Sequence, residues 1–217
     1  GMPTVVEMGG VSNFMVTFTP DGFGDYTGVL RITNNSPTVT YMVNLAGSCF
    51  GLSTNVGPNA GGNTLTITNG NLGAVTNVLV GGVQATIEAT GANWVRITMP
   101  STGSAGVKDI LIQAGSDIEL ISAYAVNEAG IIYTNLPTSG SRTGGYEVVI
   151  TGTNLCNGGD VTNVTLCGTV ATVLSQSATQ VIVTAGAAVG AVTGDVRVVS
   201  VSFGATVKSD AFIYTVD

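Results

Sequence analysis

The sequence predicts an all-β protein made of tandem β-sandwiches with a partial β-domain before them, and three observations lead to this prediction. Strings of Val, Ile and Thr are interrupted by Gly, Asn and Ser, and the 217 residues include 31 glycines. This composition is typical of short strands joined by tight turns. No stretch shows the apolar spacing of an amphipathic helix without interruption by Gly or β-branched residues. The third observation is an internal repeat.

The second half of the chain repeats the segment before it. GGNTLTITNGNLG at 61–73 returns as GGYEVVITGTNLC at 144–156, and VTNVLVGGVQAT at 75–86 returns, after a three-residue insertion, as VTNVTLCGTVAT at 161–172. About half of the aligned positions are identical, far more than residue usage alone would give. Because a period above about 80 residues fits one small sandwich better than a solenoid unit, we expect one domain used twice.

Each copy can be divided into strands from the alternation of its side chains. Leu65 and Ile67 point to one side of a predicted strand, and Val148 and Ile150 match them in the second copy. Gly81–Gly82 and Cys167–Gly168 then form the two-residue turns of hairpins. With further strands, each copy reaches six or seven, the number in an immunoglobulin (Ig)-like sandwich. Those strands are expected at 94–99, 108–113, 118–125, 180–185, 195–202 and 210–216.

Residues 129–217 resemble an IPT/TIG domain, and residues 49–128 follow the same order. The resemblance is carried by Pro137, Gly144, Gly145, ITGTNL at 150–155, TQVIV at 179–183 and Phe212-Ile213-Tyr214, and in the first copy by Pro58, Gly61, Gly62, Ile67 to Leu72 and Tyr124. The resemblance implies an Ig-like sandwich that occurs in cell-surface receptors, bacterial adhesins, polysaccharide-degrading enzymes and Rel-type transcription factors. It points to a fold more than to a function, because these residues are turn glycines and core positions.

Residues 1–48 are similar to the closing strands of ASH/Hydin-type Ig-like domains. The similarity lies in FMVTFTP at 14–20, GDYTGVLRITNN at 24–35 and VNLAG at 43–47. A whole domain of that type needs about 100 residues, so we interpret 1–48 as a truncated domain. Its strands would expose an apolar face and open edges, and we expect them to pack on the first repeat or to self-associate with another chain.

The charge and the missing histidines exclude several function classes. Thirteen acidic against six basic residues give a net charge of −7, which repels a phosphate backbone and argues against nucleic-acid binding. The absence of histidine removes the commonest catalytic base and zinc ligand. The most apolar region, 180–192, is too short and too rich in glycine for a membrane span, so we expect no membrane insertion.

Two of the three cysteines suggest a covalent bridge. Cys156 and Cys167 have counterparts Gly73 and Gly81 in the first repeat, so both are present in one copy and absent from the other. This pattern predicts a Cys156–Cys167 disulfide worth about 2–3 kcal/mol, against the alternative of two unrelated buried thiols. Cys49 would be left free or would link chains. A bridge and two glycan acceptor motifs, at Asn34 and Asn163, would both indicate an oxidising extracellular compartment.

Trp94 and Arg96 are the candidate ligand contacts. If Val95 and Ile97 face the core, alternation turns Trp94 and Arg96 outward, and Trp94 is replaced by the polar Gln180 in the second repeat. An exposed indole beside an arginine suits stacking on a sugar ring or anchoring a protein contact. The alternative is that Trp94 only covers a neighbouring domain.

No metal, cofactor or catalytic site is expected. Asp21 and Asp25 in one loop, and Asn157 and Asp160 in another, could offer oxygens to calcium, but turn chemistry explains these residues without a metal. Glycosidases use paired carboxylates, yet nothing in the sequence brings the only pair considered, Glu88 and Glu119, together.

The sequence therefore predicts a non-enzymatic module that acts as a spacer or adhesion repeat within a larger extracellular or cell-surface protein. Its partner would be a protein or a glycan at the cell surface. The alternative function is a carbohydrate-binding accessory domain of a polysaccharide-active enzyme, and the alternatives are distinguished by the surroundings of Trp94.

Overall fold

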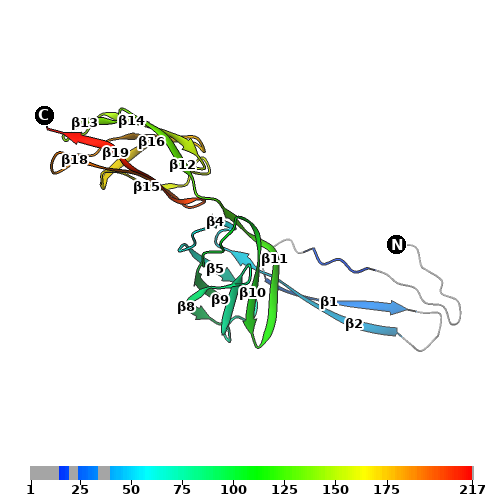
Figure 1. Cartoon of the computed structure of the whole chain (residues 1–217). Coiled ribbons are helices and arrows are strands. Elements are labelled where there is room, and N and C mark those ends of the chain that lie inside the picture. Colours follow the sequence, from blue (N-terminus) through cyan, green and yellow to red (C-terminus); the bar gives the residue numbers. More distant parts are fainter. Residues whose placement is uncertain (1–14, 20–23, 34–39, 217) are drawn as a thin grey trace.

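The computed structural model describes residues 15–19, 24–33 and 40–216, and this part of the chain is all-β, as predicted. Figure 1 shows two β-sandwiches joined end to end and a two-stranded ribbon that extends from the first of them. The described residues contain no helix. The strings of β-branched residues between turn glycines therefore form strands throughout.

The first sandwich consists of two facing sheets. One has the order β3 (Gly51–Leu52), β5 (Thr64–Thr68), β9 (Trp94–Thr98), β8 (Thr86–Gly91). The other has the order β4 (Val56–Pro58), β11 (Ser116–Asn127), β10 (Gly106–Ala114), β6 (Asn77–Val80), β7 (Val83–Gln84). Alternate residues of the central strands fill the space between the sheets, because successive side chains of a strand point to opposite faces. These buried residues include Leu65, Ile67, Val78, Val80, Val95, Ile97, Ile110, Ile112 and Tyr124.

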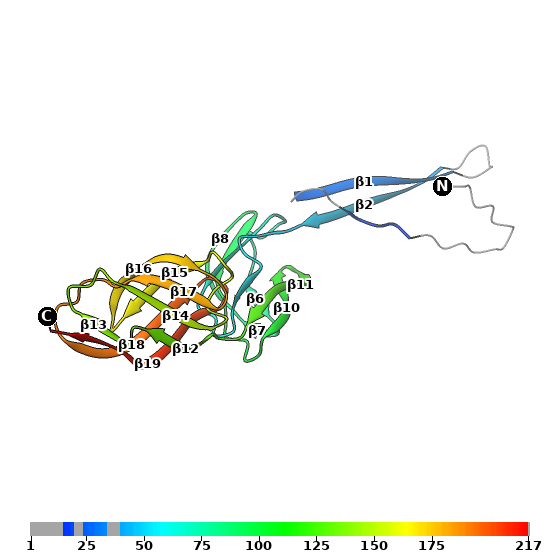
Figure 2. The ribbon, with the colours of Figure 1, turned by 90° about the horizontal axis from the view of Figure 1, so that it is seen from above.

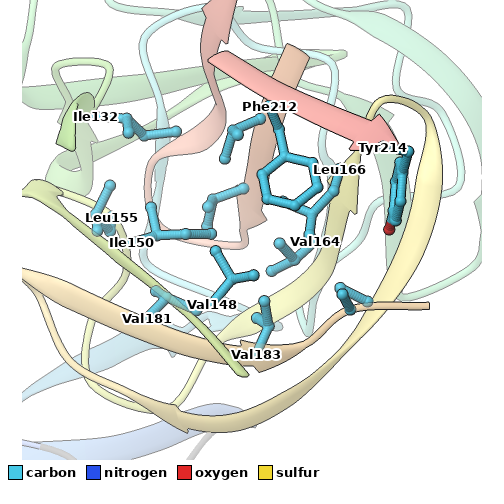
Figure 3. Packing of buried hydrophobic residues seen from close by; sticks show 14 residues of the cluster. Ile132, Val148, Ile150, Leu155, Val164, Leu166, Val181, Val183, Phe212 and Tyr214 are labelled. Carbon is cyan, nitrogen blue, oxygen red and sulfur yellow. The ribbon is translucent and has the colours of Figure 1, made fainter. Parts of the chain in front are cut away.

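The second sandwich repeats this order of strands. The first layer has the order β12 (Ile131–Leu136), β14 (Glu147–Thr153), β17 (Gln180–Thr184), β16 (Thr169–Gln176). The strand order continues from β16 into the second layer, with β15 (Val161–Leu166), β18 (Val192–Ser200), β19 (Gly204–Thr215) and β13 (Ser139–Ser141). β16 belongs to both sheets and replaces the separate β7 and β8 of the first sandwich. Figure 3 shows the buried side chains, Val148, Ile150, Leu155, Val164 and Phe212 among them, directed toward one another between the layers.

The Gly-Gly pair that begins each repeat has the same conformation in both copies. Gly61 and Gly62 have φ of 68° and 82°, and Gly144 and Gly145 have φ of 70° and 83°. In each pair the second N–H donates to the carbonyl that directly follows the neighbouring strand of the same sheet, of Met99 after β9 in one copy and of Ala185 after β17 in the other. A Cβ at Gly61 or Gly144 would lie 2.5–2.6 Å from the backbone that follows those carbonyls. Only glycine allows this approach at positive φ, which explains why the sequence repeats the pair.

The predicted hairpin turns are confirmed. Gly81 and Gly82 have φ of 55° and 81°, and Cys167 and Gly168 have φ of 50° and 79°. Two consecutive positive φ values define the primed turn that matches the twist of a hairpin. Cys167 therefore occupies a left-handed position that is glycine in the first repeat.

The N-terminal ribbon pairs β1 (Gly24–Thr33) with β2 (Thr40–Cys49) in a sheet of its own. Figures 1 and 2 show it extending away from the first sandwich rather than lying on it, so the described part of 1–48 does not pack on the first repeat. The other alternative, association with another chain, stays a prediction. The segment predicted as a strand at 14–20 is also corrected, because its described residues, 15–19, pair in no sheet. Phe14 and Pro20 lie outside the described residues.

Candidate functional site

The outer face of the β3–β5–β9–β8 sheet carries the predicted contact residues. Val95 and Ile97 are fully buried, so Trp94, Arg96 and Thr98 point to the other side of the strand, as the alternation predicted. On the neighbouring strand β5, Thr64, Thr66 and Thr68 pair with Thr98, Arg96 and Trp94 and share this face. The face is therefore a row of threonine hydroxyls beside one indole and one guanidinium group.

Trp94 is half-buried, and its surroundings explain why. It is paired with Gly91 across the β8–β9 hairpin, and a Cβ at Gly91 would come within 2.1 Å of the indole Nε1. The indole therefore lies against the backbone of a residue that has no side chain. Gln180, the corresponding residue of the second sandwich, is exposed and offers no aromatic surface.

Arg96 is paired with Glu88 rather than left as a free positive charge. The Arg96 Nε–H donates to Glu88 Oε2 at 2.8 Å, while the Thr98 and Thr64 hydroxyls donate to Oε1 at 2.6 and 3.4 Å. The hydrogen bond from Thr98 is the main cause that lowers the pKa of Glu88. With the contacts to Arg96 and Thr64, it outweighs desolvation and holds this pKa below its usual value. The two charges cancel, so this face is locally neutral.

The carboxylate pair considered for catalysis does not form. Glu88 lies on β8 in one sheet of the first sandwich, and Glu119 lies on β11 in the other sheet, where it is exposed. The core of the sandwich separates the two strands. The two groups cannot act on one glycosidic bond, because that chemistry needs carboxyl groups within about 5–10 Å of each other.

The predicted Cys156–Cys167 disulfide is wrong, because both residues are free thiols. The Cys156 S–H donates to the carbonyl of Ser177 at 3.1 Å, whereas the Cys167 S–H donates to the carbonyl of Phe212 at 3.1 Å. The two cysteines lie beyond opposite ends of the six-residue strand β15. Such a strand is about 20 Å long, and a disulfide needs Cα atoms within about 7 Å. Burial raises the pKa of both thiols, which keeps them protonated and weakly reactive.

The acidic residues weighed as calcium ligands are already used within the protein. The Asp25 carboxylate accepts the Ser48 hydroxyl at 2.6 Å, and the Asp160 carboxylate accepts the backbone N–H groups of Asn157 at 2.6 Å and Ser202 at 2.7 Å. Asp21 lies outside the described residues. Within the described part of the chain no three acidic, histidine or cysteine residues converge as a metal site would require.

Asp160 instead positions a turn that reaches the first sandwich. Besides the carboxylate contact to Ser202, the Asp160 carbonyl accepts the Val201 N–H at 3.0 Å. The turn of 201–203 between β18 and β19 then receives a hydrogen bond from the Asn127 side chain, whose N–H donates to the Ser202 carbonyl at 3.0 Å. We call these residues, together with Pro58 and Gly204, the joint.

Pro58 and Gly204 bring the two sandwiches into van der Waals contact at the joint. A Cβ at Gly204 would lie 2.9 Å from the Pro58 ring, so the backbone of β19 approaches the end of β4 closely. Sequence reasoning missed the joint, although one signal for it was present. Asp160 is the last of four residues, 157–160, that stand in the second repeat where the first repeat has Ala74 alone.

Two further expectations concern the glycan acceptor asparagines and membrane insertion. Asn163 lies within β15 and is only partly exposed, while Asn34 is outside the described residues. A search of the described residues for a helix long and apolar enough to cross a membrane found none.

Taken together, the strand order and the cores define tandem Ig-like sandwiches. Residues 131–214, the second sandwich, match the model of the IPT/TIG domain family. A search of curated proteins found no match.

Several solved structures are similar to the chain. Two structures of the extracellular region of plexin A4 align over 76% of the chain, with TM-scores of 0.51 and 0.48 and identities of 22% and 20%. SGBP-B from the mixed-linkage glucan utilization locus of Bacteroides ovatus, solved with a heptasaccharide, aligns over 75% with a TM-score of 0.29 and 20% identity. The aligned part makes up 18%, 15% and 43% of those three chains, so this chain spans a minor part of each.

Proposed function

We propose that this chain is a non-enzymatic spacer or adhesion segment of a larger extracellular or cell-surface protein. It would consist of two IPT/TIG sandwiches, 49–128 and 129–217, that follow a shorter Ig-type β-segment, 1–48. The observation that carries this proposal is the joint. A spacer must hold its ends apart, and it can do so only if adjacent domains do not swing freely about their linker.

The joint supplies three restraints of different kinds. The Asn127 side chain donates a hydrogen bond to the 201–203 turn of the second sandwich, and Pro58 is in van der Waals contact with Gly204. The Asp160 carboxylate fixes the same turn from within the second sandwich, by accepting the Ser202 N–H. The linker between Asn127 and Ile131 contains Gly130, which lies close to the second sandwich. A Cβ at Gly130 would lie 2.4 Å from Thr206 Oγ1 and 2.5 Å from the Asn154 carbonyl oxygen. The linker is therefore short and packed, and it lacks the freedom of a Gly/Ser-rich connection.

The identical strand order of the two sandwiches supports the assignment of the first one to the same family. Each has a short strand that pairs in parallel with its last strand, β4 with β11 and β13 with β19. Each also has the Gly-Gly pair and the primed turn at matching places. The proposed boundaries at 49 and 129 keep the strands of each sandwich together, and β2 of the N-terminal segment ends at the first of them, Cys49.

Backbone ¹⁵N relaxation of the whole chain tests the spacer proposal. A rigid joint predicts that amides of both sandwiches report one common, anisotropic tumbling time. A variant with Gly-Ser-Gly-Ser inserted after Glu128 should lose this coupling, and each sandwich should then tumble faster. If the unmodified chain already shows two independent tumbling times, the joint does not restrain the domains and the spacer proposal fails.

The outer face around Trp94 supports a second candidate function, the binding of a neutral glycan. An indole that lies against Gly91, with threonine hydroxyls and the Arg96–Glu88 pair beside it, combines a stacking surface with hydrogen-bonding groups. The local charges cancel and the whole chain is acidic, so an anionic glycan would gain nothing from this face.

A further inference from the structure

The β1–β2 ribbon has one face without charged residues, called here the apolar face, and one mixed face that carries both of its charges. Residues that pair across the two strands share a face, so the register Gly28–Leu45, Leu30–Val43 and Ile32–Tyr41 places six uncharged residues together. The alternate pairs form the other face, which is mixed. It carries the only two charged residues of the ribbon, Asp25 and Arg31, and polar groups such as Asn44. It also carries the exposed apolar side chains of Val29 and Met42.

The apolar face is largely uncovered in the described structure. Tyr41, Val43 and Ile32 are 59%, 44% and 38% exposed. Among the described residues, no strand other than β1 and β2 belongs to this sheet. A two-stranded ribbon is only marginally stable in water unless its apolar face packs against something. A contiguous apolar surface of this kind marks an interaction site.

The shape of the face changes along its length. At the end near the first sandwich, the Phe18 ring covers Gly47, at 3.1 Å from the position of a Cβ, and stacks edge-on against Tyr26. In the middle, Gly28 has open space above it, and a hollow lies between Phe18, Tyr26 and Leu45. At the far end, Ile32 and Tyr41 project. The face thus has a hollow at one position and bulky side chains four residues further along the same strand.

We propose that a second copy of this chain covers the apolar face, ribbon against ribbon, about a two-fold axis near the Leu30–Val43 pair. Such an axis places the Ile32–Tyr41 pair of one copy opposite the Gly28–Leu45 pair of the other. The bulky end of each copy then enters the glycine hollow of the other. No charged side chain is buried, because Asp25 and Arg31 point away from the contact.

The contact would be small. The uncovered apolar side chains of the two copies together amount to roughly 1,000 Å², a size typical of weak or transient interfaces. We therefore expect a weak dimer, with a dissociation constant in the micromolar range. Added salt strengthens it, because salt screens the repulsion between two chains of net charge −7.

Sedimentation equilibrium of the whole chain between about 5 and 500 µM tests the proposal. We expect the average mass to rise with concentration from 21.8 kDa toward twice that value. Val43 lies beside the axis, so Val43→Asp places two like charges together and weakens association at least tenfold. Asn44→Asp adds the same charge on the opposite face of the ribbon and leaves association unchanged.

A mixture of Val43→Asp and Val43→Lys chains separates a lost contact from a misfolded ribbon. Opposite charges at the axis should restore association in the mixture, although neither variant associates alone. A chain that remains monomeric at every concentration overturns the proposal. Equal weakening by Asn44→Asp and Val43→Asp, or no association in the mixture, also overturns it.

Discussion

The carboxylate of Asp160 accepts the backbone N–H of Ser202 at 2.7 Å, and this contact connects the inserted loop of the second repeat to the turn that meets the first sandwich. The two residues are 42 positions apart in the chain. Because the same turn accepts the Asn127 side chain, one carboxylate supports both the shape of this turn and one of its contacts with the first sandwich.

Replacement of Asp160 by Asn should destabilise the second sandwich by about 1–2 kcal/mol, because two N–H groups lose a charged acceptor that is partly screened by solvent. Differential scanning calorimetry measures this loss, and Asp117→Asn, at an exposed position of the first sandwich, serves as the control. Unchanged unfolding of Asp160→Asn would show that the turn holds its shape without the carboxylate.

The same carboxylate gives stability a dependence on acid. Partial burial opposes ionisation of Asp160, but the hydrogen bonds from Ser202 and Asn157 outweigh it and hold the pKa below its ordinary value of 3.8. A depressed folded-state pKa contributes stability above pH 3.8 that is lost as the pH falls through the folded-state pKa. The free energy of unfolding, measured in urea from pH 6 downward, should therefore decline less steeply for Asp160→Asn than for the unmodified chain.

Tyr214 gives the corresponding dependence on alkali. Burial raises its pKa from 10.0 to about 12, and its hydroxyl donates to the Gly186 carbonyl at 3.0 Å. A raised folded-state pKa contributes stability below pH 10 that is lost as the pH rises toward 12. Tyr214→Phe should flatten the decline of stability over this range, as followed by urea denaturation. An equally steep decline in the variant would assign the alkaline loss to other groups.

The Gly144–Gly145 pair allows a matched comparison of strain with steric overlap. Both residues have positive φ, but a Cβ has open space at Gly145 and would lie 2.6 Å from the backbone of Ala185 and Gly186 at Gly144. Gly145→Ala should cost about 1 kcal/mol from the backbone conformation alone. Gly144→Ala should cost clearly more, since the strands must also move apart. Chemical denaturation followed by circular dichroism compares them, and equal losses would contradict the close approach.

Trp94 provides the test of the glycan candidate. As the only tryptophan of the chain, it reports directly on binding in a fluorescence titration with neutral polysaccharides. Binding at this face predicts a shift in its emission, and Trp94→Phe should weaken that binding, measured by affinity electrophoresis, about tenfold. Gln180→Ala, at the corresponding position of the second sandwich, should leave it unchanged. No emission shift with any neutral glycan would exclude this function and leave the spacer proposal intact.

The sequence by itself determined the features that depend on near neighbours. Alternation placed Val95 and Ile97 in the core and Trp94 and Arg96 outside, because successive side chains of a strand point to opposite faces. The repeated Gly-Gly pairs predicted turns, because positive φ is a local steric property of glycine. The all-β class followed from the same local signals.

Only the tertiary structure decided which distant residues meet. The paired presence of Cys156 and Cys167 suggested a bridge, but β15 holds the two apart. Glu88 and Glu119 lie on opposite sheets, while Asp160 and Asn127 both reach the turn at Ser202. The length and direction of each strand fix these separations, and both depend on how the sheets pair and pack. A pattern within one strand carries no information about that arrangement, because its energy comes from contacts between segments far apart in the chain.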